Sequence, residues 1–217
     1  MTEPANLDDL RITLAPAIAD AAAFDGWTAT AVRDAAMIKG VHPDAAAFAF
    51  SGGAMDMVEA WVHAVDRAMQ ATLPAEKLAT LKIRERIRTL VQFRLDAIAG
   101  QKEALRRALS IMAMPQNAGR AMKLGWSSAD AMWRLAGDTA ADYNHYTKRL
   151  TLGSIYAATL AVYVNDKSEG HAETRAFLDR RIEGIMKFEK AKARVLRPRE
   201  EHFSPARFLG RLRYPAR

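Results

Sequence analysis

Apolar residues recur three and four positions apart along most of the chain, which is the spacing of one face of an α-helix. In residues 7–24, for example, Leu10, Leu14 and Ile18 share one stripe, and Gly26 follows as a typical helix end. The sequence contains no run of alternating apolar and polar residues bounded by turn residues, so it predicts no β-strand. The pattern therefore predicts an all-α protein.

Glycine and proline residues divide this pattern into about ten helices. The predicted helices cover residues 7–24, 28–37, 44–50, 54–73, 75–99, 102–114, 117–136, 139–164 and 171–195, and a short last one begins near Ser204. We expect residues 1–53 to form an N-terminal three-helix unit and residues 54–197 to form a larger helical domain. Residues 198–217 are expected to be a flexible link followed by the short, amphipathic C-terminal helix.

Composition and charge exclude several classes of protein. The 217 residues include no cysteine, which excludes disulfides, thiolate metal sites and a cysteine nucleophile. No stretch of about 18 apolar residues is free of charge, so we expect no membrane-spanning helix. The formal net charge is +7, but residues 1–60 hold nine acidic and three basic side chains, whereas residues 187–217 hold three acidic and ten basic ones. The basic character is therefore concentrated near the C-terminus.

The first three predicted helices have the layout of a helix-turn-helix unit. This segment resembles the start of TetR-type regulators, whose signature G-x-T-x-x-x-V-R-D-x-A is met by Gly26, Thr28, Val32, Arg33, Asp34 and Ala36. The resemblance implies a TetR-like helical bundle.

The predicted recognition helix lacks the side chains that DNA binding requires. Residues 43–50 read PDAAAFAF, with no Arg, Lys, Asn, Gln or Ser to reach bases or phosphates. The acidic balance of residues 1–60 would also repel the DNA backbone. We therefore do not expect DNA binding, and we place Phe48 and Phe50 in the core of the unit. A ligand-responsive TetR-type transcriptional regulator stays the alternative function.

A more specific resemblance covers residues 105–187. The strings RALSIMAMPQN, SADAMWRLAGDTAADYNHYTKRLTLGSIYAATLAVYVND and TRAFLDRRIEGI resemble the ubiquinone-biosynthesis lipid-binding accessory proteins, the ninth member of the coenzyme Q series. The resemblance implies a non-catalytic homodimer that binds an isoprenoid or quinone lipid and presents it to the demethoxyubiquinone hydroxylase, a di-iron enzyme. It maps a docking patch for that hydroxylase onto Met132, Asp142, His145 and Tyr146. His145 stands where the best-known members carry tryptophan, which reduces the stacking area of the patch.

Methionine and tryptophan residues cluster on both sides of Pro115, where two helices can part. Flexible apolar side chains of this kind suit the lining of a lipid pocket, although each one is also compatible with an ordinary core. The predicted lipid-binding residues are Met112, Met114, Met122, Trp126, Trp133, Ile155 and Tyr156.

The C-terminal residues 204–217 have the pattern of a short amphipathic helix. Phe208, Leu209 and Leu212 share one face of that helix, and Arg207, Arg211 and Arg213 flank it. An apolar face with an arginine rim suits the surface of an anionic membrane, so we predict membrane binding there. A disordered basic tail and a nucleic-acid arm are the alternatives.

The sequence offers no recognisable active site. Its five histidines are scattered, and Asp142 with His145 supplies only half of a carboxylate-bridged di-iron motif. We therefore expect no catalytic residue, no metal and no cofactor, with an enzyme acting on the quinone ring through Asp142 and His145 as a third hypothesis. The remaining positive charges at Arg84, Arg86, Arg88 and Arg94 are expected to form a solvated face.

The beginning of the chain carries no pattern of a secretory signal or transit peptide. Because the first helix begins almost at Met1, the sequence predicts a bacterial cytoplasmic protein that is peripheral on the inner membrane.

Overall fold

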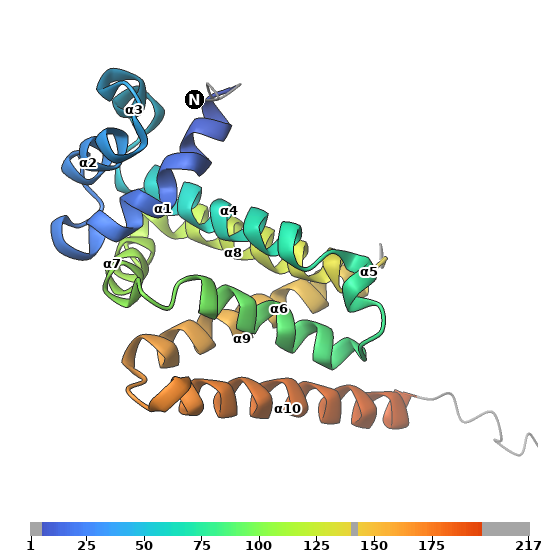
Figure 1. The fold of residues 1–217 in the computed structure, drawn as a ribbon. Helices are drawn as coiled ribbons and strands as arrows, with labels where there is room; N and C mark the ends of the chain where they lie inside the picture. Colours follow the sequence, from blue (N-terminus) through green and yellow to red (C-terminus); the bar gives the residue numbers. More distant parts are fainter. Residues whose placement is uncertain (1–5, 140–142, 197–217) are drawn as a thin grey trace, which may run out of the picture. The chain divides into compact units, whose positions relative to one another are not determined.

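The computed structural model describes residues 6–139 and 143–196, and helices make up most of them (Figure 1). The helices are α1 (Leu7–Asp25), α2 (Ala29–Lys39), α3 (Pro43–Ala49), α4 (Ala54–Thr72), α5 (Ala75–Leu78), α6 (Ile83–Ala97), α7 (Lys102–Met112), α8 (Ala118–Leu135), α9 (Tyr143–Asn165) and α10 (Ala172–Leu196). Two short 3₁₀ turns, η1 (Pro115–Asn117) and η2 (Glu169–His171), precede α8 and α10. No strand occurs in these described ranges, and the all-α prediction is confirmed.

The segment predicted as one helix over residues 75–99 is two helices, α5 and α6, and the prediction is wrong there. Polar side chains stabilise the break between α5 and α6 by hydrogen bonds to its backbone groups. The Glu85 carboxylate accepts from the backbone N–H of Lys82 at 3.2 Å, which caps the start of α6. Arg86 donates to the carbonyls of Ala79 at 2.7 Å and Leu81 at 2.8 Å, so the carbonyls at the break keep partners. The predicted helix near Ser204 lies outside the described residues.

Small side chains let the N-terminal helices approach closely. α1 packs against α2 and α4, and Ala15, Ala19 and Ala22 on α1 are fully buried. The two phenylalanines predicted for the core of this unit differ. Phe50 is buried as predicted, but Phe48 is 69% exposed, because α3 turns its Ala46 and Ala49 face toward the core instead.

A tryptophan in the α1–α2 turn joins the N-terminal helices to the rest of the chain. The indole N–H of Trp27 donates to the carbonyl of Ala104 on α7 at 3.0 Å. Its ring centroid lies 5.4 Å from that of Trp61 on α4. The neighbouring Gly26 has φ +73°, a conformation that favours glycine and lets the chain turn sharply here. The N-terminal helices therefore share a core with α4 and α7.

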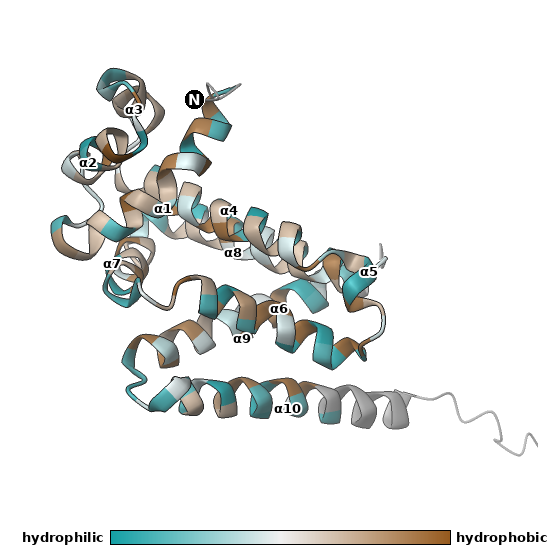
Figure 2. Ribbon diagram, in the orientation of Figure 1, coloured by the Kyte–Doolittle hydropathy of each residue, from teal (hydrophilic) through white to brown (hydrophobic). Residues whose placement is uncertain are grey.

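Helix α6 is amphipathic. Figure 2 shows hydrophobic and hydrophilic residues alternating along α6, whose buried positions are Ile87, Leu90, Val91, Arg94 and Leu95. α8 and α9 pack against each other closely, because Gly153 on α9 offers no side chain where it faces the Gly125 carbonyl on α8. No described helix is long and apolar enough to cross a membrane.

The beginning of α10 is fixed by the carboxylate of Asp166. This carboxylate accepts from the backbone N–H and hydroxyl of Ser168, at 2.8 and 2.5 Å, and from the same two groups of Thr174, at 2.8 and 2.6 Å. Contacts group the chain into one unit up to Ile182 and a second from Glu183. The division predicted at residues 53 and 197 stays a prediction.

Candidate functional site

An apolar cavity of about 310 Å³ lies among α4, α6, α7, α8 and α9. Its wall is formed by large aliphatic and aromatic side chains together with small residues. The large ones include Trp61, Leu105, Met112, Leu124, Tyr156 and Leu160. Such a lining excludes charged ligands and favours an apolar guest.

The apolar cavity reaches the surface between α7, α8 and α9. Ala113, Gly125 and Ala157 line the cavity and are also exposed. A side-chain carbon added at Gly125 would meet nothing within 4 Å. Small residues therefore keep this opening free.

One wall of the apolar cavity carries a buried charge. Arg94 is 1% exposed, and its Nη1 forms an ion pair with the Oδ1 of Asp66. Its Nη2 donates to the hydroxyl of Ser128 at 3.2 Å, and that hydroxyl donates to the other Asp66 oxygen at 3.2 Å. The guanidinium carbon lies 4.8 Å from the centre of the Tyr156 ring. The three polar residues thus tie α4, α6 and α8 together, and Asp66 neutralises the arginine.

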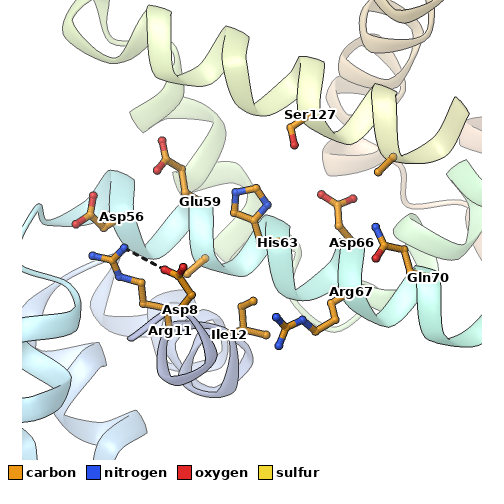
Figure 3. Close-up of a pocket in the computed structure, with 12 residues that line it drawn as sticks. Asp8, Arg11, Ile12, Asp56, Glu59, His63, Asp66, Arg67, Gln70 and Ser127 are labelled. Atoms are coloured by element: carbon orange, nitrogen blue, oxygen red, sulfur yellow. Dashed lines mark ion pairs between the residues drawn. The ribbon is translucent and has the colours of Figure 1, made fainter. Parts of the chain in front are cut away.

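A polar groove of about 490 Å³ lies between α1, α4 and α8 (Figure 3). Figure 3 shows Glu59, His63 and Asp66 on the side of α4 that faces α8. Arg120 donates to Glu59 at 2.7 and 2.8 Å and to Asp56 at 2.6 Å, and these hydrogen bonds hold its pKa above the usual value. Within the described residues, no group of His, Asp and Glu is arranged to hold a metal ion. Asp66 lines this groove and pairs with Arg94, so the buried ion pair separates the polar groove from the apolar cavity.

An aromatic patch, formed by Trp126, His145 and Tyr146, lies where α8 meets the start of α9. The ring centroids are 5.2 to 6.2 Å apart. Tyr146 is 58% exposed, and Met122 and Leu150 are further exposed apolar side chains on the same two helices. Trp126 and His145 are half-buried beside Tyr146, and an aromatic cluster that reaches the surface is typical of binding sites.

A buried ionic network supports the aromatic patch. Arg149, 2% exposed in its side chain, donates to Asp130 at 2.6 Å and to Asp138 at 3.0 Å, and to the carbonyl of His145 at 3.1 Å. Lys148 donates to the second Asp138 oxygen at 2.6 Å. This network fixes the corner between α8 and α9.

Residues 118–189 match the COQ9 family model. Among curated relatives, the mitochondrial ubiquinone biosynthesis protein COQ9 of Rattus norvegicus is 34% identical, and the alignment covers 74% of this chain and 54% of the relative. The corresponding Homo sapiens protein is 33% identical over 74% of this chain and 52% of the relative. This chain belongs to the COQ9 family. It spans about half the length of the curated relatives that it matches.

The COQ9-family chain also resembles a solved TetR transcriptional regulator from Nitrosomonas europaea ATCC 19718, with a TM-score of 0.65 and 22% identity. The alignment covers 82% of this chain and 98% of the regulator. At this identity the likeness concerns the fold alone, and it confirms the TetR-like helical bundle. The names of the COQ9 relatives describe biosynthesis proteins and state no reaction.

The prediction of a bacterial cytoplasmic protein, peripheral on the inner membrane, is wrong. Both COQ9 relatives are mitochondrial proteins by name. The prediction used the position at which the chain begins. In a chain that spans half the length of its relatives, that position carries no information on targeting.

The predicted lipid-binding residues of this COQ9-family chain are divided between the apolar cavity and the surface. Met112 and Tyr156 line the cavity. Ile155, next to Tyr156 in the sequence, is buried but does not line the cavity. Met114 and Met122 are exposed, at 43% and 72%. Trp126 belongs to the aromatic patch. The Trp133 indole donates to the Lys148 carbonyl at 2.9 Å and does not line the cavity.

The predicted docking residues are brought together only in part. His145 and Tyr146 lie in the aromatic patch, but Met132 is fully buried in the core. Asp142 lies outside the described residues, as do the predicted membrane-binding residues Arg207, Phe208, Leu209, Arg211, Leu212 and Arg213.

Sequence reasoning missed the buried ion pair. Arg94 was expected on a solvated face, and that expectation is wrong because its guanidinium pairs with Asp66 inside the molecule. A signal was present: residues 87, 90, 91 and 94 share one face of α6, so Arg94 continues an apolar stripe. Arg86 is also not simply solvated, because its three hydrogen bonds to carbonyls include one to Ala136 at 2.8 Å.

Proposed function

We propose that this COQ9-family chain is a non-catalytic lipid-binding protein that supports ubiquinone biosynthesis. The apolar cavity holds the head and the adjoining part of the tail of an isoprenoid or quinone lipid. The observation that carries the proposal is this cavity, in a chain whose relatives are ubiquinone biosynthesis proteins.

The size of the apolar cavity fits only part of such a lipid. Its volume of about 310 Å³ is near the lower end of the roughly 300–1,000 Å³ range of ligand pockets. A long polyprenyl tail therefore leaves through the opening at Ala113, Gly125 and Ala157. Met122 is exposed on α8 between the cavity-lining Ala121 and Leu124, and can cover part of the emerging tail.

The aromatic patch is the docking surface that we propose for the demethoxyubiquinone hydroxylase. Tyrosine and tryptophan side chains contribute much of the binding energy in protein interfaces. Arg149 anchors the backbone of the patch through its hydrogen bond to the His145 carbonyl. The patch and the opening of the cavity lie on the same two helices, α8 and α9. A lipid leaving the cavity would therefore emerge beside the bound enzyme.

We further propose that the chain is a homodimer that binds the membrane surface through its basic C-terminal residues. The dimer is what the family resemblance implies. The support for the membrane contact is the sequence pattern of residues 204–217, in which Arg207, Arg211 and Arg213 flank an apolar face. Sedimentation of the protein with anionic vesicles tests the membrane contact, and light scattering tests the dimer. A variant with these three arginines replaced by glutamine should stay in the supernatant.

Lipid content is the decisive measurement. The protein is purified from cells that make ubiquinone, and the extracted lipids are identified by mass spectrometry. We expect an isoprenoid or quinone lipid in the wild type and much less of it in Ala157→Phe, because the phenyl ring would fill the opening. Ala161→Phe is the matched control, since Ala161 is exposed on the same helix but does not line the cavity. Empty wild-type preparations, or equal lipid in both variants, would contradict the proposal.

A further inference from the structure

The buried Arg94 has an unused hydrogen-bond donor in the wall of the apolar cavity. Its Nη1 and Nη2 are bonded to Asp66 and Ser128, but its buried Nε has no hydrogen-bond partner among the described residues. Burying a polar group without a partner is unfavourable, and such groups are uncommon in folded proteins. Arg94 itself lines the cavity, so a cavity ligand can supply the missing acceptor.

The charge around Arg94 restricts the kind of acceptor. Of the described residues that line the cavity, Arg94 is the one with a charged side chain. Its charge is already neutralised by Asp66, whose side chain is 9% exposed. A carboxylate or phosphate placed beside this pair would add an uncompensated buried negative charge, which is strongly unfavourable. A neutral oxygen would accept the hydrogen bond without adding charge.

We infer that Arg94 determines which lipid heads the apolar cavity accepts. It favours a neutral head with a carbonyl, hydroxyl or ether oxygen, and the Arg94–Asp66 pair excludes free fatty acids and prenyl phosphates. This inference rests on the proposed lipid-binding function and adds the chemical class of the head. Ser128 contributes by fixing the guanidinium, since its hydroxyl bridges Nη2 and the second Asp66 oxygen.

Three probes of similar tail length separate the contributions to binding. They are a benzoquinone with a ten-carbon alkyl tail, decylbenzene, and decanoate, each presented to the delipidated full-length protein from a cyclodextrin carrier. Decylbenzene measures apolar burial without an acceptor, and decanoate adds an anionic head. We expect the quinone to bind at least about tenfold more tightly than decylbenzene, the lower end of what a hydrogen bond to a charged donor contributes. Decanoate should bind more weakly than either.

Two variants test the residue assignment. In Arg94→Met with Asp66→Leu both charges are gone, so the fold keeps no unpaired buried ion, and the preference for quinone over decylbenzene should disappear. In Asp66→Asn the arginine loses its neutralising partner, so binding should shift toward decanoate. The matched control is the double variant Arg88→Met with Asp179→Leu, which removes an exposed Arg–Asp ion pair whose arginine also lies on α6. The control should bind the three probes with the same preferences as the wild type.

The outcomes distinguish this inference from the proposed function. If decylbenzene binds the wild type but the quinone binds no more tightly, the protein is a lipid carrier and the role of Arg94 is refuted. Tightest binding of decanoate to the wild type, or a quinone preference that survives in the double variant, refutes it equally. If none of the probes binds, the proposed function fails and the inference fails with it.

Discussion

The ionic network beneath the aromatic patch should contribute strongly to stability. Arg149 is buried, and its Asp138 partner has a side chain that is only 5% exposed. Replacement of Arg149 by Met removes the bonds to Asp130, Asp138 and the His145 carbonyl. Removing one partner of a buried ion pair costs about 3–5 kcal/mol. Because Asp138 keeps Lys148 and Asp130 keeps Arg134, we expect a value near the lower limit, about 3 kcal/mol.

Urea unfolding followed by tryptophan fluorescence measures this loss. With a denaturant dependence of about 2–3 kcal/mol per molar urea, the midpoint of Arg149→Met should fall by about 1 M. The matched control is Arg134→Met, because Arg134 bonds the same Asp130 at 2.8 Å but is 73% exposed. An exposed pair contributes about 0–1 kcal/mol, so that midpoint should hardly move. Equal shifts in the two variants would refute the assignment of a buried network.

Three further predictions concern titration, capping and docking. Burial, with the negative charges of Asp96 and Asp166, raises the pKa of Tyr163 to about 12. The neutral phenol of Tyr163 should therefore contribute fully to stability below about pH 10, and this contribution should be lost as the pH rises toward the folded pKa of about 12. An absorbance titration should show a late phenolate that is missing in Tyr163→Phe. Burial raises the pKa of Asp166, but the hydrogen bonds from Ser168 and Thr174 outweigh it and hold that pKa well below the usual range. Asp166→Ala should lower stability by about 1.5–3 kcal/mol at pH 7, and the difference from wild type should shrink as the pH falls below about 4; a pH-independent difference would contradict this. Tyr146→Ala should weaken binding to the demethoxyubiquinone hydroxylase about tenfold in a calorimetric titration, whereas Phe24→Ala, at a still more exposed aromatic residue on α1, should have no effect.

Helical periodicity was sufficient to predict most of the helices but not their interruptions. The apolar stripe continues across residues 79–82, and the break between α5 and α6 depends on Arg86, whose carbonyl partners include Ala136, 50 residues away. A partner so distant in sequence leaves no trace in local spacing. The same limit explains Phe48, since period and hydrophobicity cannot tell an apolar side chain that faces the core from one that is exposed.

The candidate site was predictable where an apolar residue lies on a helix face shared by others. Met112 and Tyr156 line the cavity, whereas Met114 and Met122, of similar chemistry, are exposed. Met114 follows the end of α7 and directly precedes the turn at Pro115–Asn117, and Met122 lies on the exposed face of α8. Arg94 was predicted to face solvent because it is charged, although its position on α6 places it on the buried face with Ile87, Leu90 and Val91. Its carboxylate partner, Asp66, lies on another helix.

The contact between Trp27 and Trp61 has a mechanical consequence. Trp61 lines the apolar cavity, and its ring lies against Trp27 in the turn of the N-terminal helices. A guest molecule in the cavity is thus separated from those helices by a single side chain. A guest that displaces the Trp61 ring would therefore also change the packing of Trp27, which lies at the junction of α1 and α2. The contact places the N-terminal helices, whose α3 carries no basic side chain, where they would respond to the occupancy of the cavity.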